Sequence, residues 1–486
     1  MNDKYANNLR IGWAQTDITP EQPVLIAGQF HARLSEGIAD PITATALVLD
    51  SGQDYAVLVS LDVVTISDEM LRMVRERIQG IEGLDPLKVI LNATHTHTGP
   101  DVRVASPGMS NVPNTLGVEL DAMPVESYLD MATERIAAAV TKAWTGRTEG
   151  RITYGLGYAV VGRNRRWVNT DGKAQMYGNT DDAQFSHIEG YEDHSLNVLA
   201  TYSTEGALTG LVVNVPSPSQ VNESEYCLSA DYWYETRCEL RRRHGNELFV
   251  LPQCSMAGDQ SPHLLFDKGA NDRMLELKGR SEREEIAHRI TRTVDEILGA
   301  VSETAQNAPL LRHRVEVLEL PMTSLTEEDV GAALKEAETY RINYQDELRK
   351  LEDDPKLREE PRWYVPITNA HRRMRWYQAV ADRFEMQKEN STMPAEVHVI
   401  RLGDLAFASN RFECYLDMGI HIKARSPACQ TFLVQLAGEG TYCPSERSVA
   451  GGGYGSIAAS NPVGPEAGRL LSMKTVDLLM ELWEDA

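Results

Sequence analysis

Runs of hydrophobic residues alternate with short polar turns along the first part of the chain. Residues 43–49 and 55–61 are rich in apolar and β-branched residues, and the polar segment between them is typical of a turn, so they predict two paired strands. Ser67 is a helix-capping residue. The apolar positions after it recur at helical spacing; they are Met70, Leu71, Val74 and Ile78. A buried strand, residues 87–91, completes a strand, helix, strand unit.

The rest of the chain continues this alternation. Further strands are predicted over residues 152–161, 193–202, 208–215, 247–252, 314–320, 396–402 and 405–408. Helices are predicted over residues 125–144, 231–243, 282–301 and 466–483. This order predicts an α/β fold with a mixed β-sheet core flanked by helices.

Residues 323–390 differ from the rest because they are highly charged and helical in pattern. Glu327 and Glu328 fall in a capped first turn, and the charge runs are interpreted as solvated helix faces. No repeat and no low-complexity linker separates this segment from its surroundings. We therefore expect a single domain over residues 1–486, with residues 323–390 as a helical excursion packed on its core.

The composition narrows the classes of partner. With 486 residues and a hydrophobic fraction of 42%, the chain can bury a large core. Its formal net charge of −23 would repel phosphates, which argues against nucleic acid and anionic membrane surfaces. The most apolar stretches are far shorter than the span of about 20 residues that crosses a bilayer, so no membrane anchor is expected. A small-molecule substrate fits these limits, and a homo-oligomer stays open.

The N-terminus shows no basic region followed by a long apolar one, so a cytoplasmic protein is expected. A secreted form whose leader has been removed is the alternative. The six cysteines have no Cys-x-x-Cys spacing and are interpreted as scattered reduced thiols. They are Cys227, Cys238, Cys254, Cys414, Cys429 and Cys443.

The segment Asn-Ala-Thr-His-Thr-His-Thr-Gly-Pro, residues 92–100, is the strongest candidate for chemistry. It follows the predicted strand, and residues two apart in an extended backbone point to the same side. His95 and His97 would then face a metal ion or a substrate at the strand's C-terminal end, where open α/β sheets bind ligands. The competing interpretation is a pair of histidines bonded to loop carbonyls.

Other candidate groups stand on strand ends and loops further along the chain. Glu413 follows the predicted hairpin, and its carboxylate is a plausible hard ligand for a metal ion. Tyr442 and Tyr454 lie on loops, the second of them rich in glycine, where tyrosines often contact substrate. Each of these features is common in many folds when taken alone.

Together these segments resemble one family, the neutral ceramidases and their bacterial relatives, which are zinc-dependent amide hydrolases acting on N-acylated sphingoid bases. Residues 11–20 resemble the family's opening, and residues 92–100 resemble its His-Thr-His-Ser-Gly-Pro motif. Gly-Asp-Gln-Ser-Pro at residues 258–262 resembles its Gly-Asp-Val-Ser-Pro segment, and residues 422–427 follow Glu413 at a similar spacing. The resemblance covers most of the chain and implies the family's N-terminal catalytic-domain fold. No counterpart of the family's C-terminal immunoglobulin-like domain is expected, because the given sequence ends soon after the helix predicted over residues 466–483.

The resemblance assigns roles residue by residue. It makes His95, Glu413 and Tyr442 the ligands of one zinc ion. His97 and Tyr454 would face the scissile group, with His97 transferring protons and Tyr454 stabilising the oxyanion.

Substrate-binding residues are expected around the second motif. Ser261 resembles a family serine once regarded as a nucleophile, and a hydrogen bond to a substrate hydroxyl is the preferred role. Asp259 would hold a polar substrate together with the loop residues Asn164 and Arg165.

One departure from the family concerns the metal. The family carries a second zinc-binding histidine at a strand end, and Pro216 stands at that position here. The candidates to replace it are His97, His194, Gln220, Asp231 and His263. One divalent ion is expected, zinc by resemblance, while a site poor in nitrogen ligands would also suit Mn²⁺, Mg²⁺ or Ca²⁺.

The sequence thus predicts a metal-dependent hydrolase that cleaves an amide or related bond in a small, hydroxyl-bearing substrate, using water activated by the ion. A carbohydrate-active hydrolase or lyase on the same scaffold is one alternative. A catalytically silent binding protein, in which the missing histidine marks lost function, is the other.

Overall fold

A large mixed β-sheet forms the centre of the protein, for which a computed structural model describes residues 8–104 and 114–484. Its strand order is β16 (Phe249–Cys254), β14 (Leu208–Val215), β13 (Ser195–Ser203), β8 (Thr148–Tyr158), β1 (Arg10–Asp17), β5 (Thr43–Asp50), β6 (Tyr55–Leu61) and β7 (Val89–Ala93). The pairs β14–β16 and β6–β7 are parallel, and the other neighbours are antiparallel. The predicted mixed sheet is confirmed.

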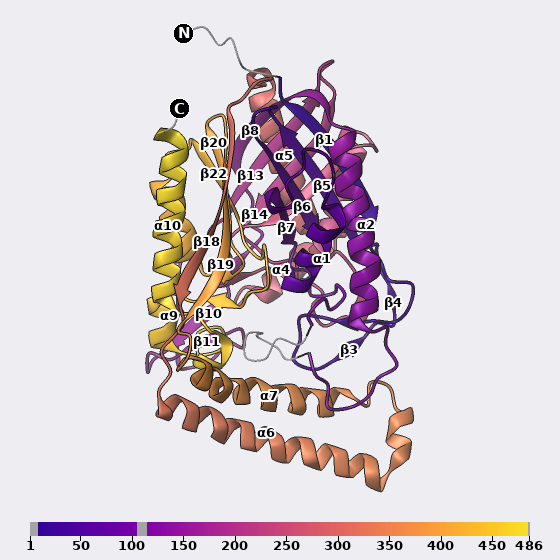
Figure 1. The fold of residues 1–486 in the computed structure, drawn as a ribbon. Coiled ribbons are helices and arrows are strands. Elements are labelled where there is room, and N and C mark those ends of the chain that lie inside the picture. Colours follow the sequence, from indigo (N-terminus) through magenta and orange to yellow (C-terminus); the bar gives the residue numbers. More distant parts are fainter. Residues whose placement is uncertain (1–7, 105–113, 485–486) are drawn as a thin grey trace.

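A second, smaller sheet packs face to face against the large one (Figure 1). It consists of β18 (Leu311–Pro321), β19 (Thr392–Leu402), β20 (Leu405–Ser409) and β22 (Gln430–Val434). Leu47 and Leu251 of the large sheet lie in one buried cluster with Phe407 and Phe432 of the small sheet. Alternate residues of each strand therefore face either this inner core or the outer helices.

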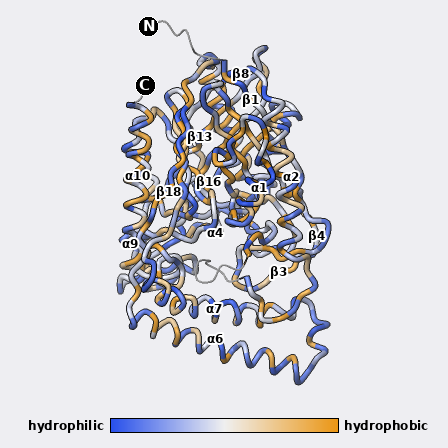
Figure 2. Tube along the Cα trace, in the orientation of Figure 1, coloured by the Kyte–Doolittle hydropathy of each residue, from blue (hydrophilic) through white to orange (hydrophobic). Residues whose placement is uncertain are grey.

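Helices cover the two outer faces. On the large sheet, α1 (Asp68–Ile78) and α2 (Val125–Thr145) pack over one half, while α3 (Tyr232–His244) and α5 (Glu282–Val301) pack over the other. On the small sheet, α8 (Leu416–Arg425) and α10 (Pro465–Glu484) cover the outer face. Hydrophobic segments run through the centre of these layers in Figure 2, as expected for two sheets enclosed by amphipathic helices.

A long helix pair, α6 (Glu327–Asp353) and α7 (Val365–Met386), lies across one end of the sheets (Figure 1). Thr326 and Asp329 form a capping box at the start of α6, which places Glu327 and Glu328 in the capped first turn. On α7, Trp376 packs edge-on against Phe30 and also contacts Tyr454, which lies on the glycine-rich loop named in the sequence analysis. Of the helices in the described ranges, none is long and apolar enough to cross a membrane.

Short strand pairs at the sheet ends hold the loops. They are β2 (Leu25–Ile26) with β3 (Arg33–Leu34), β4 (Gly37–Ile38) with β15 (Cys227–Leu228), β9 (Arg163–Asn164) with β17 (Gln260–Ser261), and β21 (Glu413–Cys414) with β23 (Tyr442–Cys443). A small sheet joins β10 (Arg166–Asn169), β11 (Ala174–Met176) and β12 (Phe185–Ile188). The helices α4 (Lys268–Lys278) and α9 (Glu446–Gly451) complete the set. Two of these pairs, β9–β17 and β21–β23, carry residues that the sequence singled out.

Candidate functional site

The two histidines of the first motif converge, although not in the way the sequence suggested. Strand β7 ends at Ala93, and His95 has a left-handed backbone with φ of 62°. The expectation of an extended backbone through His97 is therefore wrong. The turn nevertheless brings the two rings edge to face at 4.9 Å between centroids, with the Nε2 atoms 3.4 Å apart.

His95 is held by the carbonyl of Val64, which lies 2.6 Å from Nδ1. Because a carbonyl can only accept, Nδ1 carries a proton. Nε2 of the same ring lies 3.5 Å from Oε1 of Glu413. Nδ1 of His95 is thus bonded to a loop carbonyl, as the competing interpretation of the motif expected, while Nε2 faces the candidate site.

Glu413 and Tyr442 are brought together by strand register. In the parallel pair β21–β23 these two residues are direct partners, and both are buried. Tyr454 packs its ring edge-on against Tyr442 at 5.6 Å between centroids. The structure therefore gathers five of the residues predicted from sequence, at the ends of three separate chain segments. They are His95, His97, Glu413, Tyr442 and Tyr454.

Arg165 lies in the middle of this group. Its guanidinium donates from Nη2 to Oε1 of Glu413 at 2.6 Å, with the phenol oxygen of Tyr442 3.4 Å away, and from Nη1 to the phenol oxygen of Tyr177 at 2.8 Å. Burial opposes its charge, but the two phenols and the carboxylate outweigh burial and raise the pKa of Arg165. Arg165 is therefore a permanent cation at the centre of the site.

The same cation acts on Glu413. Burial raises the pKa of this carboxyl, yet His95 and Arg165 outweigh it, and the net pKa of Glu413 is lowered. The carboxylate is consequently ionised and paired. Burial, followed by the nearby His95 and Arg33, holds the pKa of His97 well below its usual value. His97 is neutral near pH 7.

A network that the sequence did not reveal continues from Tyr177. Gln220 donates to the phenol oxygen of Tyr177 and to Oε2 of Glu223, the latter at 3.1 Å. Glu223 also lies 3.5 Å from Nδ1 of His97 and 3.3 Å from Nε2 of His263. Tyr177, Glu223 and His263 line a cavity of about 460 Å³ beside α4 and the start of α5.

Neither Tyr177 nor Glu223 stands in a motif, so the sequence offered no signal for them. Gln220 and His263 were named as replacements for the missing histidine, and both belong to this network. Among the other candidates, His194 pairs with Glu192 and Asp231 caps α3.

Three predicted substrate-binding residues contact mainly the protein itself. The pairing of β9 with β17 sets Asn164 opposite Gln260 and brings Asp259 beside it. Asp259 accepts from the backbone of Leu416 at 2.9 Å, and burial raises its pKa to about 6. Ser261 accepts from the backbone of His263 at 3.1 Å. Their role toward a substrate stays a prediction.

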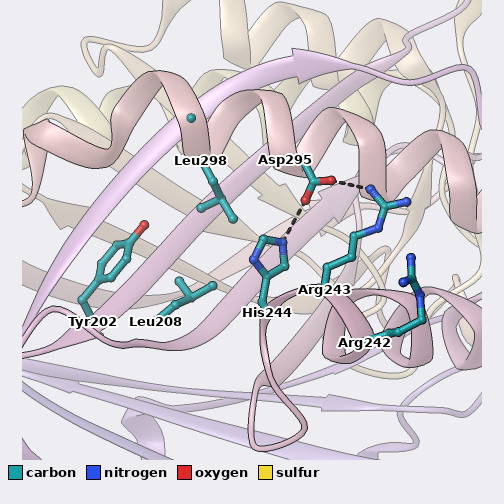
Figure 3. Close-up of a pocket in the computed structure, with 8 residues that line it drawn as sticks. Tyr202, Leu208, Arg242, Arg243, His244, Asp295 and Leu298 are labelled. Atoms are coloured by element: carbon teal, nitrogen blue, oxygen red, sulfur yellow. Dashed lines mark hydrogen bonds and ion pairs between the residues drawn. The ribbon is translucent and has the colours of Figure 1, made fainter.

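Another hollow, of about 700 Å³, lies between the end of α3 and α5 (Figure 3). His244 and Arg243 both point at Asp295 there, with His244 Nε2 2.8 Å from the carboxylate. Asp295 thus pairs with both of these groups, while Arg242, which also lines the hollow, pairs with Glu239 on α3. None of the residues predicted for the site lines it.

Solved structures similar to this chain identify the architecture. The neutral ceramidase from Pseudomonas aeruginosa matches 99% of this chain and 75% of its own, with a TM-score of 0.68 and 17% sequence identity. The chain has a neutral ceramidase-like fold. A structure described as ceramidase complexed with C2 matches 99% of this chain and 76% of its own, with a TM-score of 0.67 and 16% identity. No family model and no curated protein matches the sequence.

This ceramidase-like chain brings three of the expected zinc ligands together, His95, Glu413 and Tyr442, and has Pro216 where the family has a further histidine. Nη2 of Arg165 lies 2.6 Å from Oε1 of Glu413 and 3.4 Å from the phenol oxygen of Tyr442, so a buried cation stands beside two of the expected ligands. Within residues 8–104 and 114–484, no group of three or more His, Cys, Asp and Glu side chains could hold a metal. A set that includes a tyrosine, such as His95, Glu413 and Tyr442, stays a prediction.

Proposed function

We propose that this chain is a hydrolase that cleaves an amide or a related bond in a small polar substrate bearing hydroxyl groups. The observation that carries the proposal is the convergence of two imidazoles and two phenols on a ceramidase-like fold. These groups belong to His95, His97, Tyr442 and Tyr454. The two solved structures named above are described as ceramidases, and the bond that a ceramidase cleaves is an amide.

His97 is the proposed general base. Its Nδ1 is buried and makes no hydrogen bond within the described residues, although Oε2 of Glu223 lies 3.5 Å away. A neutral imidazole in this position can take a proton from water as the water oxygen attacks the carbonyl carbon. The imidazolium then returns the proton to the leaving nitrogen as the carbon–nitrogen bond breaks, which yields an acid and an amine.

Phenol groups are the proposed oxyanion donors. The phenol oxygens of Tyr177 and Tyr442 face Arg165 Nη1 and Nη2, so each phenol keeps its own proton to donate elsewhere. Donors fixed in advance, with a cation behind them, stabilise the negative charge that develops on the carbonyl oxygen. No step of this chemistry is assigned to a metal.

A second candidate is a carbohydrate-active hydrolase or lyase. The observation that favours it is the grouping of three phenols and two imidazoles around one fixed guanidinium, belonging to Arg165. Elimination requires one group that removes a proton and another that protonates the leaving oxygen, and phenol and imidazole can serve both purposes.

Activity panels separate these candidates. The wild-type chain is incubated, once with a chelator and once with added zinc, with short N-acyl amides of hydroxylated amines and with neutral and acidic oligosaccharides, and products are identified by mass spectrometry. Release of an amine supports the amidase, and an unsaturated sugar supports a lyase. Turnover of neither panel would refute both and favour the binding protein.

His97→Ala is expected to lower the rate on the accepted substrate by about 10²–10⁴-fold, because it removes the proton-transfer group. The matched control is His187→Ala, which alters an exposed histidine on β12 and leaves the rate unchanged. A His97→Ala protein that is folded and fully active would exclude His97 as the base.

A further inference from the structure

We propose that a basic cleft beside α5 binds a small soluble molecule through a phosphate monoester group. The cleft has a volume of about 620 Å³ and lies between the end of β8, the end of α4 and one face of α5. This volume is within the range of about 300–1,000 Å³ that is usual for small-molecule sites. None of the residues assigned to the candidate site lines the cleft, so the inference goes beyond the proposed function and does not depend on it.

The charge of the cleft is opposite to that of the whole chain. Among the described residues, five cationic side chains and two carboxylates line it, although the chain carries a formal net charge of −23. The cations are Arg163 on β9, Lys278 and Arg280 around the end of α4, and Arg289 and Arg292 on α5, and the carboxylates are Glu285 and Glu296. A hollow that gathers cations from three separate segments attracts a small anion locally, even though the whole molecule repels anions.

The carboxylates of the cleft do not balance its cations. Three cations surround the carboxylate of Glu285. They are Lys278 at 2.6 Å, Arg280 at 2.9 Å and Arg289 at 3.4 Å. Burial raises the pKa of Glu285, but these cations outweigh burial and lower the pKa to about 2. One negative charge thus faces three positive charges.

Two further guanidinium groups are available to a ligand. Arg292 is exposed and makes no hydrogen bond or ion pair with any residue in the part of the chain that the structure describes. Arg163 lies 3.9 Å from Glu192, which is a long distance for an ion pair. A guanidinium can donate two parallel hydrogen bonds to a phosphate group. A phosphate monoester carries about 1.5–2 negative charges at pH 7, so it suits this excess of positive charge better than a carboxylate does.

The cleft also offers a contact for the rest of the ligand. The ring of Tyr158 lines it and is 72% exposed. An exposed aromatic ring gives a large apolar face at little cost in conformational entropy. Beside the cations, this ring suits a phosphate group that is attached to a sugar.

The test measures binding by titration calorimetry at low salt. Inorganic phosphate and ribose 5-phosphate are the probes, and ribose is the uncharged control. We expect both phosphates to bind the wild type, more weakly as salt is added, and ribose not to bind. Tyr158→Ala should weaken the binding of ribose 5-phosphate but not that of inorganic phosphate.

Arg292→Gln is the decisive variant, because the side chain has no partner whose loss would disturb the fold. Binding of both phosphates should weaken by about tenfold or more, as expected for the loss of a hydrogen bond between charged groups. The matched control is Arg242→Gln on α3, which removes the same charge from an exposed pair with Glu239 and should leave binding unchanged.

Glu285→Gln tests the proposal in the opposite direction. Loss of the carboxylate frees three cations, so phosphate should bind this variant more tightly than it binds the wild type. Phosphate should also raise the Tm of this variant more than the Tm of the wild type, because a ligand that binds the folded state stabilises it. If this variant does not fold, the comparison of Arg292→Gln with Arg242→Gln decides.

Three results would overturn the proposal. The first is a wild type that binds neither phosphate, and the second is equal weakening in Arg292→Gln and Arg242→Gln, which would mean a general effect of net charge. The third comes from vesicles that contain phosphatidic acid, which present the same phosphate monoester on a lipid surface. Binding to these vesicles without binding to the soluble phosphates would assign the cleft to a lipid headgroup.

Discussion

At the scale of single residues, the pair formed by Glu413 and Arg165 is expected to have a large effect on stability. Both side chains are buried and lie 2.6 Å apart. Glu413→Ala leaves the guanidinium buried without its carboxylate, and such a loss typically costs about 3–5 kcal/mol of the free energy of unfolding. Urea denaturation of the variant beside the wild type measures the difference.

The matched control is Glu338→Ala on α6, which removes a carboxylate paired with Arg341 at the surface. Exposed pairs of this kind contribute little, so a change within about 0.5 kcal/mol is expected. Equal effects of the two substitutions would contradict the view that the buried pair is the important one.

Single residues also show what the sequence could and could not predict about the site. His95 and Glu413 were found because strand ends and a motif mark them, and the structure gathers them as expected. Arg165 was expected to bind substrate, yet its donors are directed at protein groups. Tyr177 and Glu223 carry no local signal, because only the tertiary fold brings them beside His97 and Arg165.

At the scale of elements, the packing of α2 on β1 depends on Gly12. A Cβ at this position would lie 1.9 Å from the carbonyl oxygen of Ala143 on α2, which is a backbone atom and cannot rotate away. Gly12→Ala must therefore push the helix off the sheet. We expect a loss of at least about 1–3 kcal/mol in the free energy of unfolding, measured by urea denaturation.

Gly299→Ala provides the opposite control. Gly299 lies within α5, and a Cβ there meets nothing within 4 Å. Alanine favours a helix over glycine, so this variant should gain up to about 1 kcal/mol. A Gly12→Ala protein as stable as the wild type would show that α2 does not approach β1 this closely.

The sequence predicted most elements but missed some, and the length of the apolar pattern explains which. Long elements such as α5 and β14 carry a clear hydrophobic pattern and were found. No residue of α4 is buried, so it has no apolar stripe for a pattern to reveal. The strand β22 begins with the polar residues Gln430 and Thr431, so its apolar run is only three residues long although all of its positions are buried.

At the scale of the whole molecule, the sequence predicted a mixed sheet with flanking helices but not the second sheet facing the first. Strand order depends on contacts between distant segments, and β1 lies between β8 and β5, which no local pattern indicates. The buried faces of the two sheets meet through residues such as Leu47 and Phe407. A hydrophobic face indicates that a strand is buried on that side, but it does not indicate which element covers it.

The contact between the two sheets should make the fold sensitive to acid. His313 on β18 lies at this contact, with Nδ1 3.1 Å from the carbonyl of Tyr55 on the large sheet and Nε2 3.0 Å from Nδ1 of His398. Burial and the neighbouring His398 lower the pKa of His313 from 6.5 to about 3. The folded protein therefore stays unprotonated at this residue, while the unfolded chain binds a proton below pH 6.5.

Because the folded pKa is depressed, the stability linked to this proton is complete above about pH 6.5 and is lost as the pH falls toward 3. The expected slope is about 1.4 kcal/mol per pH unit for one proton. His313→Gln should remove this part of the slope in urea denaturation between pH 7 and 5, whereas His187→Gln, at an exposed position, should leave it unchanged. An unaltered slope in His313→Gln would show that the acid sensitivity arises away from the contact between the sheets.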